Sequence, residues 1–83
     1  MIDTDLCAAI RGVLHECDGR PTSHTAIYVY VRPRIRGPVI VADVWNHLLH
    51  LENAGEVDRH ANRDDKTLVS WTLTDAGKTR PRI

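Results

Sequence analysis

The sequence predicts a single α+β domain in which three helices precede a two-stranded β-hairpin. Apolar residues recur every three or four positions in residues 4–17 and 41–54, a spacing typical of helices with one buried face. From Val57 onward the apolar positions alternate, which is typical of strands. A chain of 83 residues suits one hydrophobic core. We therefore assign residues 1–78 to one domain and residues 79–83 to a loosely held basic tail.

The first helix is expected to begin at Asp3 or Thr4, either of which can cap its N-terminus. Asp18, Gly19 and Pro21 end it. Its buried face carries residues at helical spacing, namely Leu6, Ile10, Val13, Leu14 and Cys17. Cys7 and Cys17 are separated by roughly 15 Å of helical rise, too far for a disulfide, and both are expected to be buried thiols.

The segment HTAIYVYVRPRI, which follows the potential cap Ser23, is ambiguous. Its β-branched and aromatic residues favour a strand, whereas its place in the order of elements favours a short helix. A helix would bury Ile27, Tyr30 and Val31, and a strand would bury Ile27, Val29 and Val31. We favour the helix, which Pro33 and then Gly37-Pro38 bring to an end.

The third helix is expected to begin between Val39 and Val41 and to run to Ala54. Its buried stripe consists of Val41, Val44, Leu48 and Leu51. Gly55 suits the left-handed conformation that closes a helix, so the chain can reverse there into the first strand.

Two strands and a short last turn complete the prediction. Residues 67–73 form the second strand, and the polar segment 62–66 forms the turn between the strands. Val69, Trp71 and Leu73 share one face of that strand by the two-residue period. Thr74 can cap a single turn of helix that ends near Gly77.

This order of elements, with LLHLENAGEV followed by WTLTDAGK, resembles the winged helix-turn-helix of small prokaryotic regulators, including the MarR type. The similarity covers residues 39–78 well and residues 3–38 only by element order. It implies that the third helix lies in the major groove of double-stranded DNA and that the hairpin, the wing, contacts the backbone or minor groove. The long dimerisation helices of MarR-type proteins have no counterpart here, so a homodimer is a possible partner that the resemblance leaves open.

The DNA-binding interpretation assigns roles to particular side chains. The exposed face of the third helix offers groups that can hydrogen-bond base edges, namely Asn46, His47 and His50. The rigid loop before that helix and the wing offer cations for phosphates, namely Arg32, Arg34, Arg36, Arg59, Arg63 and Lys66. Asp64 and Asp65 cancel the charge of the wing tip, which weakens this interpretation.

A protein-interaction module on the same scaffold is the alternative function. Trp45 and Leu49 flank the exposed face of the third helix and suit a protein partner as well as they suit DNA. The chain carries eleven basic and eleven acidic residues, so it has no net charge to attract nucleic acid at long range. A continuous positive face favours DNA, whereas an apolar patch around Trp45 favours a protein partner.

Other classes of function find no support in the sequence. No segment has the length of a membrane span or the pattern of a signal peptide, so we expect a cytoplasmic protein. His47 and His50 are spaced for one helix face, but neither they nor Cys17, His15 and His24 form a metal-binding motif. Ser23 and Ser70 lack the setting of a nucleophile, and we expect neither an enzyme, a cofactor nor a small-molecule substrate.

Overall fold

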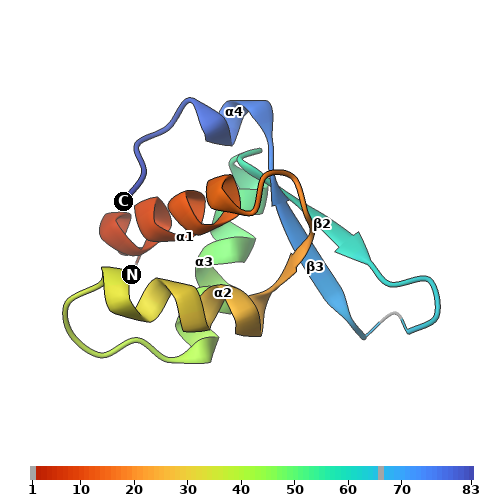
Figure 1. The fold of residues 1–83 in the computed structure, drawn as a ribbon, viewed down its shortest axis with the longest axis horizontal. Coiled ribbons are helices and arrows are strands. Elements are labelled where there is room, and N and C mark those ends of the chain that lie inside the picture. Colours follow the sequence, from red (N-terminus) through yellow and green to blue (C-terminus); the bar gives the residue numbers. More distant parts are fainter. Residues whose placement is uncertain (1, 66) are drawn as a thin grey trace.

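The computed structural model describes residues 2–65 and 67–83, which form helices packed beside one small sheet (Figure 1). Lys66 lies outside the described residues. The elements in chain order are α1 (Thr4–Glu16), β1 (Thr22–Ser23), α2 (His24–Val31), the 3-10 helix η1 (Arg32–Arg34), α3 (Val41–Asn53), β2 (Val57–Ala61), β3 (Val69–Leu73) and α4 (Asp75–Lys78). The β2–β3 hairpin extends away from the helices (Figure 1). The predicted α+β order is confirmed.

The described sheet has three antiparallel strands in the order β1-β3-β2, one more than the predicted hairpin. Strand β2 pairs with β3 from Val57 opposite Leu73 to Ala61 opposite Val69. The added strand is the pair Thr22–Ser23, with Thr22 opposite Trp71. Two residues are too few to show a period, so the sequence pattern did not indicate this strand.

The core lies where α1, α2 and α3 meet the base of the sheet, and it includes Trp71, Ile10, Leu14, Leu48 and Leu51. Residues 24–31 are helical, and the side chain of Ser23 accepts a hydrogen bond from the Ala26 amide as the predicted cap. Ile27 and Val31 are fully buried as expected. Tyr30 is 57% exposed, so the prediction that it is buried was wrong. An eight-residue helix turns only a narrow face to the core, and here positions 27 and 31 occupy it.

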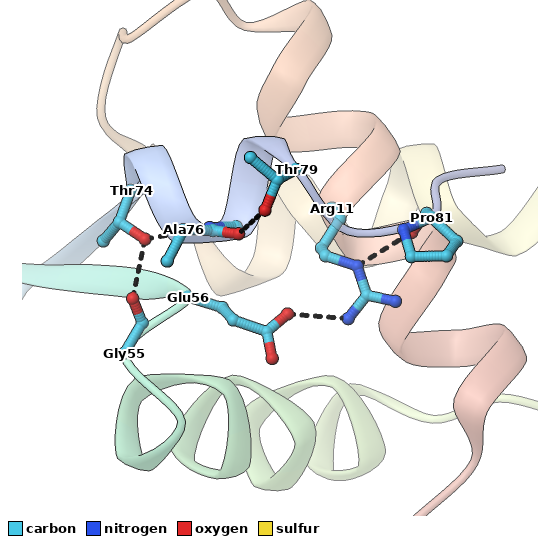
Figure 2. Close-up of polar contacts among 8 residues, drawn as sticks. Arg11, Gly55, Glu56, Thr74, Ala76, Thr79 and Pro81 are labelled. Atoms are coloured by element: carbon cyan, nitrogen blue, oxygen red, sulfur yellow. Dashed lines mark hydrogen bonds and ion pairs between the residues drawn. The ribbon is translucent and has the colours of Figure 1, made fainter.

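The end of α3 and the start of α4 pack directly against each other (Figure 2). Gly55 has φ +75°, and the amides of Gly55 and Glu56 donate to the carbonyls of Glu52 and Leu51, which closes the helix as predicted. The Thr74 hydroxyl donates to the Gly55 carbonyl at 2.7 Å and accepts from the Gly77 amide at 3.1 Å. These hydrogen bonds join the two motifs, L-E-N-A-G and L-T-D-A-G.

A buried ion pair joins α1 to the same junction. Arg11 Nη1 donates to Glu56 Oε1 at 2.9 Å, and the two side chains are only 10% and 11% exposed. The Arg11 Nε–H donates to the Pro81 carbonyl at 2.8 Å (Figure 2). One guanidinium therefore connects α1, the α3–β2 junction and the end of the chain.

Residues 79–83, the C-terminal strap, lie against α1. The Ile83 amide donates to the Ala8 carbonyl at 3.2 Å. Gly12 provides room for this contact, because a Cβ there would overlap the Ile83 backbone oxygen. Residues 79–83, predicted as a basic tail, therefore have specific contacts with α1. The strap is attached to α1 through the Arg11 side chain and through backbone groups. Contacts of these kinds do not produce a periodic pattern of apolar residues, so the sequence did not indicate them.

The two cysteines are free thiols, and Cys7 is buried as predicted. Cys17 is only partly buried, so the prediction that it is buried was wrong. Burial raises the pKa of the Cys7 thiol, and the nearby Arg11 guanidinium opposes this only in part. Because the thiolate is the reactive form, we expect Cys17 to be alkylated well before Cys7 in the folded protein at neutral pH. Mass spectrometry of partly alkylated protein measures the order. Equal alkylation rates of the two cysteines in the folded protein would contradict this expectation. The control is the protein unfolded in urea, where the two rates should be equal.

None of the helices in the described ranges is long and apolar enough to cross a membrane. Within residues 2–65 and 67–83, no group of three or more His, Cys, Asp or Glu side chains is arranged to hold a metal ion.

Candidate nucleic-acid interface

Helix α3 presents one polar face to solvent. Asp43 stabilises its first turn, because a carboxylate oxygen accepts from the Ile40 amide at 3.2 Å. Val44, Leu48 and Leu51 are buried and fix the rotation of the helix about its axis. The exposed or half-buried residues on the opposite side are Ala42, Asn46, His50 and Asn53. Asn46 and His50 are four positions apart, so their side chains lie on the same face.

His47 is part of the core, and the prediction that it lies on the exposed face was wrong. It is 6% exposed, and both ring nitrogens are within hydrogen-bond distance of backbone groups. Nε2 accepts from the Asp3 amide at 2.9 Å, and Nδ1 lies 2.6 Å from the Asp43 carbonyl. A carbonyl can only accept, so the ring is neutral with its proton on Nδ1. His47 thus joins the start of α1 to α3 and is not available to base edges.

The three arginines before α3 have different environments. The Arg34 guanidinium pairs with Glu16 of α1 and also donates to the Ile83 backbone oxygen at 3.1 Å. Two of its donors therefore have partners within the protein, which the sequence did not reveal. Arg36 is exposed on the loop. Arg32 is exposed as well, with its guanidinium 5.5 Å from the centre of the Tyr28 ring.

The tip of the wing is organised by its own polar side chains. Asn62 Oδ1 accepts from the amides of Asp64 and Asp65, and the Asp65 carboxylate accepts from the Thr67 hydroxyl and amide. These bonds from Thr67 lower the pKa of Asp65. Arg63 is exposed at this tip. The predicted role of Lys66 falls outside the described residues.

A shallow groove of about 570 Å³ lies between the start of α2, helix α3 and the wing. Its lining consists of Ser23, His24, Thr25, Trp45, Asn62, Thr67, Leu68, Val69 and Ser70. Within the described part of the chain this lining contains no Arg or Lys. The groove is therefore a poor site for a phosphate by itself, and cations for a nucleic-acid backbone must come from its margins.

Trp45 and Leu49 do not form an exposed apolar patch, because both are partly buried against the core. The Trp45 ring makes edge contacts with His24 and with Trp71, at centroid distances of 4.9 and 5.6 Å. Among the described residues, the large exposed apolar side chains are Ile2, Val29, Tyr30, Ile40, Leu68 and Ile83. Of these, Leu68 lines the groove together with Trp45.

Arg59 has partners that the sequence analysis did not consider. Its Nη2 donates to Glu52 Oε1 of α3 at 2.9 Å, and its guanidinium lies 5.1 Å from the Trp71 ring centre. The positions of Glu52 and Arg59 on either side of Gly55 were enough to indicate this contact. Residues 52 and 59 stand three before and four after the Gly55 hinge, so a reversal there brings them side by side.

Comparison with known proteins identifies the fold. No protein-family model matches the sequence, and no curated protein sequence is similar to it. Solved structures are similar, each with a TM-score of 0.68. They are a point mutant of Lactococcus lactis ZitR (19% identity), a probable transcriptional regulator from Pseudomonas aeruginosa (18%) and the S. aureus MepR–DNA complex (20%).

The alignments cover 88%, 94% and 93% of this chain, and 44%, 52% and 56% of the respective regulators. The chain thus spans about half the length of these proteins. At this level of identity the likeness establishes the fold. The chain has the winged-helix fold of MarR-type transcriptional regulators, as its sequence predicted.

Proposed function

We propose that this protein binds double-stranded DNA, with the exposed face of α3 in the major groove and the wing beside it, and that it acts as a small transcriptional regulator. The observation that carries the proposal is the polar face of α3 bearing Asn46 and His50, which the rest of the fold leaves uncovered. Amide and imidazole groups on an exposed helix are suited to base edges. The MepR structure with a similar fold is a DNA complex.

Cations for the phosphates lie at both ends of this face. Arg32 and Arg36 precede α3, while Arg59 and Arg63 lie on the wing that follows it. His47 is left out of the proposed interface because backbone groups occupy both of its ring nitrogens. Arg34 is left out because it has two partners within the protein and its side chain is only 24% exposed, against 39% for Arg59. Trp45 and Leu49 are themselves half-buried, so in the protein-interaction alternative the exposed apolar group beside Trp45 is Leu68, which is 57% exposed and lines the same groove.

Two substitutions test the separate roles. Arg36→Ala should weaken binding to every duplex and reduce the slope of log affinity against log salt by about 0.9, the contribution of one phosphate contact. Asn46→Ala should instead change the preferred sequence, with a cost of about 1–3 kcal/mol on the best site. Selection from a random duplex library, followed by fluorescence anisotropy from low to physiological salt, measures both effects.

Arg82→Ala is the matched control for charge. Arg82 belongs to the strap, and its guanidinium donates to the carbonyl of Lys78, the last residue of α4, so its loss removes the same charge from another surface. An equal loss of affinity from Arg82→Ala and Arg36→Ala would mean that net charge alone matters. Folded protein that binds no duplex even at low salt would eliminate the proposal.

Sedimentation velocity with and without duplex completes the test, because it reports stoichiometry together with binding. A homodimer should place two α3 helices roughly 34 Å apart on a palindromic site. A monomer should protect a single half-site.

A further inference from the structure

Arg59 is held in place by two kinds of contact. The Glu52 carboxylate accepts its Nη2–H at 2.9 Å. The guanidinium also lies over the rings of Trp71 and Trp45, at 5.1 and 5.8 Å from the ring centres. Trp71 is fully buried and Trp45 partly buried, so these rings form a fixed support for the cation.

We infer that Glu52 is an internal competitor for the Arg59 guanidinium: it occupies the Nη2 donor and neutralises the charge with which Arg59 would bind a DNA phosphate, and so lowers the affinity for DNA. This inference rests on the proposed function and adds a residue that sets its strength. Carboxylate and phosphate oxygens accept from a guanidinium in the same way, so one ligand excludes the other from the same donor. Among the described residues, Glu52 is the only hydrogen-bond partner of the Arg59 side chain.

The environment of the pair makes this exchange feasible. The Arg59 and Glu52 side chains are 39% and 34% exposed, so an incoming anion can reach them. A partly exposed ion pair contributes only about 0–1 kcal/mol, far less than the buried Arg11–Glu56 pair can cost when it is broken. The aromatic support remains after Glu52 is displaced. Arg59 would then stay positioned at the flank of α3 with its donors free.

The position of the pair also connects it to the reading helix. Glu52 belongs to α3, two residues after His50, and Arg59 belongs to β2 of the wing. A phosphate bound by Arg59 would therefore lie at the boundary between α3 and the wing. In the free protein the Glu52 carboxylate, which is negatively charged like a phosphate, lies at that boundary and accepts from Arg59.

The test is a double-mutant cycle on duplex affinity. Glu52→Gln keeps the size of the side chain and removes its charge. We expect it to tighten binding roughly threefold to fivefold, the value of one partly exposed ion pair. The salt slope should change by less than about 0.9, because the wild-type protein makes the same phosphate contact once Glu52 has been displaced. In an Arg59→Met background the same change should have no such effect.

Asp58→Asn is the matched control, since it removes one negative charge from the neighbouring residue of β2. Asp58 is exposed and takes part in none of the ion pairs found among the described residues. If Glu52→Gln gains no more than Asp58→Asn, or keeps its gain in the Arg59→Met background, the effect is one of net charge and the inference falls. Weaker binding by Glu52→Gln also overturns it, because Glu52 would then hold Arg59 in the binding position.

The failure of this inference is distinguishable from failure of the proposed function. Wild-type protein that binds duplex while Glu52→Gln leaves affinity unchanged refutes the inference alone. Absence of binding by both proteins refutes the proposed function and the inference with it. Circular dichroism confirms that each variant is folded, and Glu52→Ala provides a second variant that should gain affinity in the same direction.

Discussion

Replacing Arg11 with methionine is expected to lower the free energy of unfolding by about 3–5 kcal/mol. The change leaves the Glu56 carboxylate 11% exposed with no cation beside it. An unpaired charge in that position loses most of its hydration without compensation. A domain of this size has roughly 5–10 kcal/mol of stability in total, so the substitution should remove a large part of it.

The position of Arg11 increases the effect. Its guanidinium also donates to the Pro81 carbonyl, so the strap loses one of its attachments to α1. Glu56 follows the Gly55 hinge directly, and its carbonyl accepts the Thr74 amide at 3.0 Å. Loss of the pair should therefore loosen the strap and the α3–β2 junction together.

Urea unfolding followed by tryptophan fluorescence measures the cost. Lys78→Met is the control, because the Lys78–Asp75 pair is 3.7 Å long with both side chains well exposed, and its loss should cost at most about 1 kcal/mol. The double variant Arg11→Met/Glu56→Met should be more stable than Arg11→Met alone, since it removes the orphaned charge. A cost for Arg11→Met no larger than that of Lys78→Met would show that the pair is unimportant.

The sequence predicted those parts of the fold that depend on local signals. Helices α1 and α3 were predicted from apolar residues on one face, and the hairpin from the change to a two-residue period at Val57. The end of α3 at Gly55 was predicted because few residues other than glycine adopt a positive φ without strain. Each of these signals lies within a few residues of the feature that it predicts.

Long-range contacts explain what the sequence did not predict. His47 lies at the border of the exposed face by helical angle, and only the Asp3 amide, 44 residues earlier, makes it a core residue. The sequence around Arg34 gives no sign of its two partners, Glu16 and the Ile83 backbone oxygen, which lie 18 residues before it and 49 residues after it. Asn46 and His50 were predicted to be exposed from their angular positions on the helix, and both are exposed in the structure.

The second large effect is expected for Gly77→Ala, which should lower the free energy of unfolding by about 2–4 kcal/mol. In an ordinary helix this change is stabilising by up to about 1 kcal/mol, because glycine loses more backbone entropy on folding. Here a Cβ on Gly77 would overlap the Glu56 carbonyl oxygen and lie 2.6 Å from Leu73 Cδ1. The leucine can move, but the carbonyl is part of the backbone.

The Glu56 carbonyl is fixed from several directions. The carbonyl accepts a hydrogen bond from the Thr74 amide. The Glu56 amide donates to the Leu51 carbonyl at the end of α3, and the Glu56 carboxylate is paired with Arg11. A shift that relieves the overlap must therefore break one of these contacts. This is the physical reason why a glycine follows three residues after Thr74 in the L-T-D-A-G motif.

Gly55→Ala distinguishes steric overlap from backbone strain. A Cβ at Gly55 meets nothing within 4 Å, but φ is +75°, so alanine there should cost only about 1–2 kcal/mol. Gly77 has no positive φ and should nevertheless be the more damaging site. Urea unfolding of both variants ranks them. A Gly77→Ala protein as stable as the wild type would mean that α4 can lift off the α3–β2 junction without cost, and that the two motifs do not depend on each other.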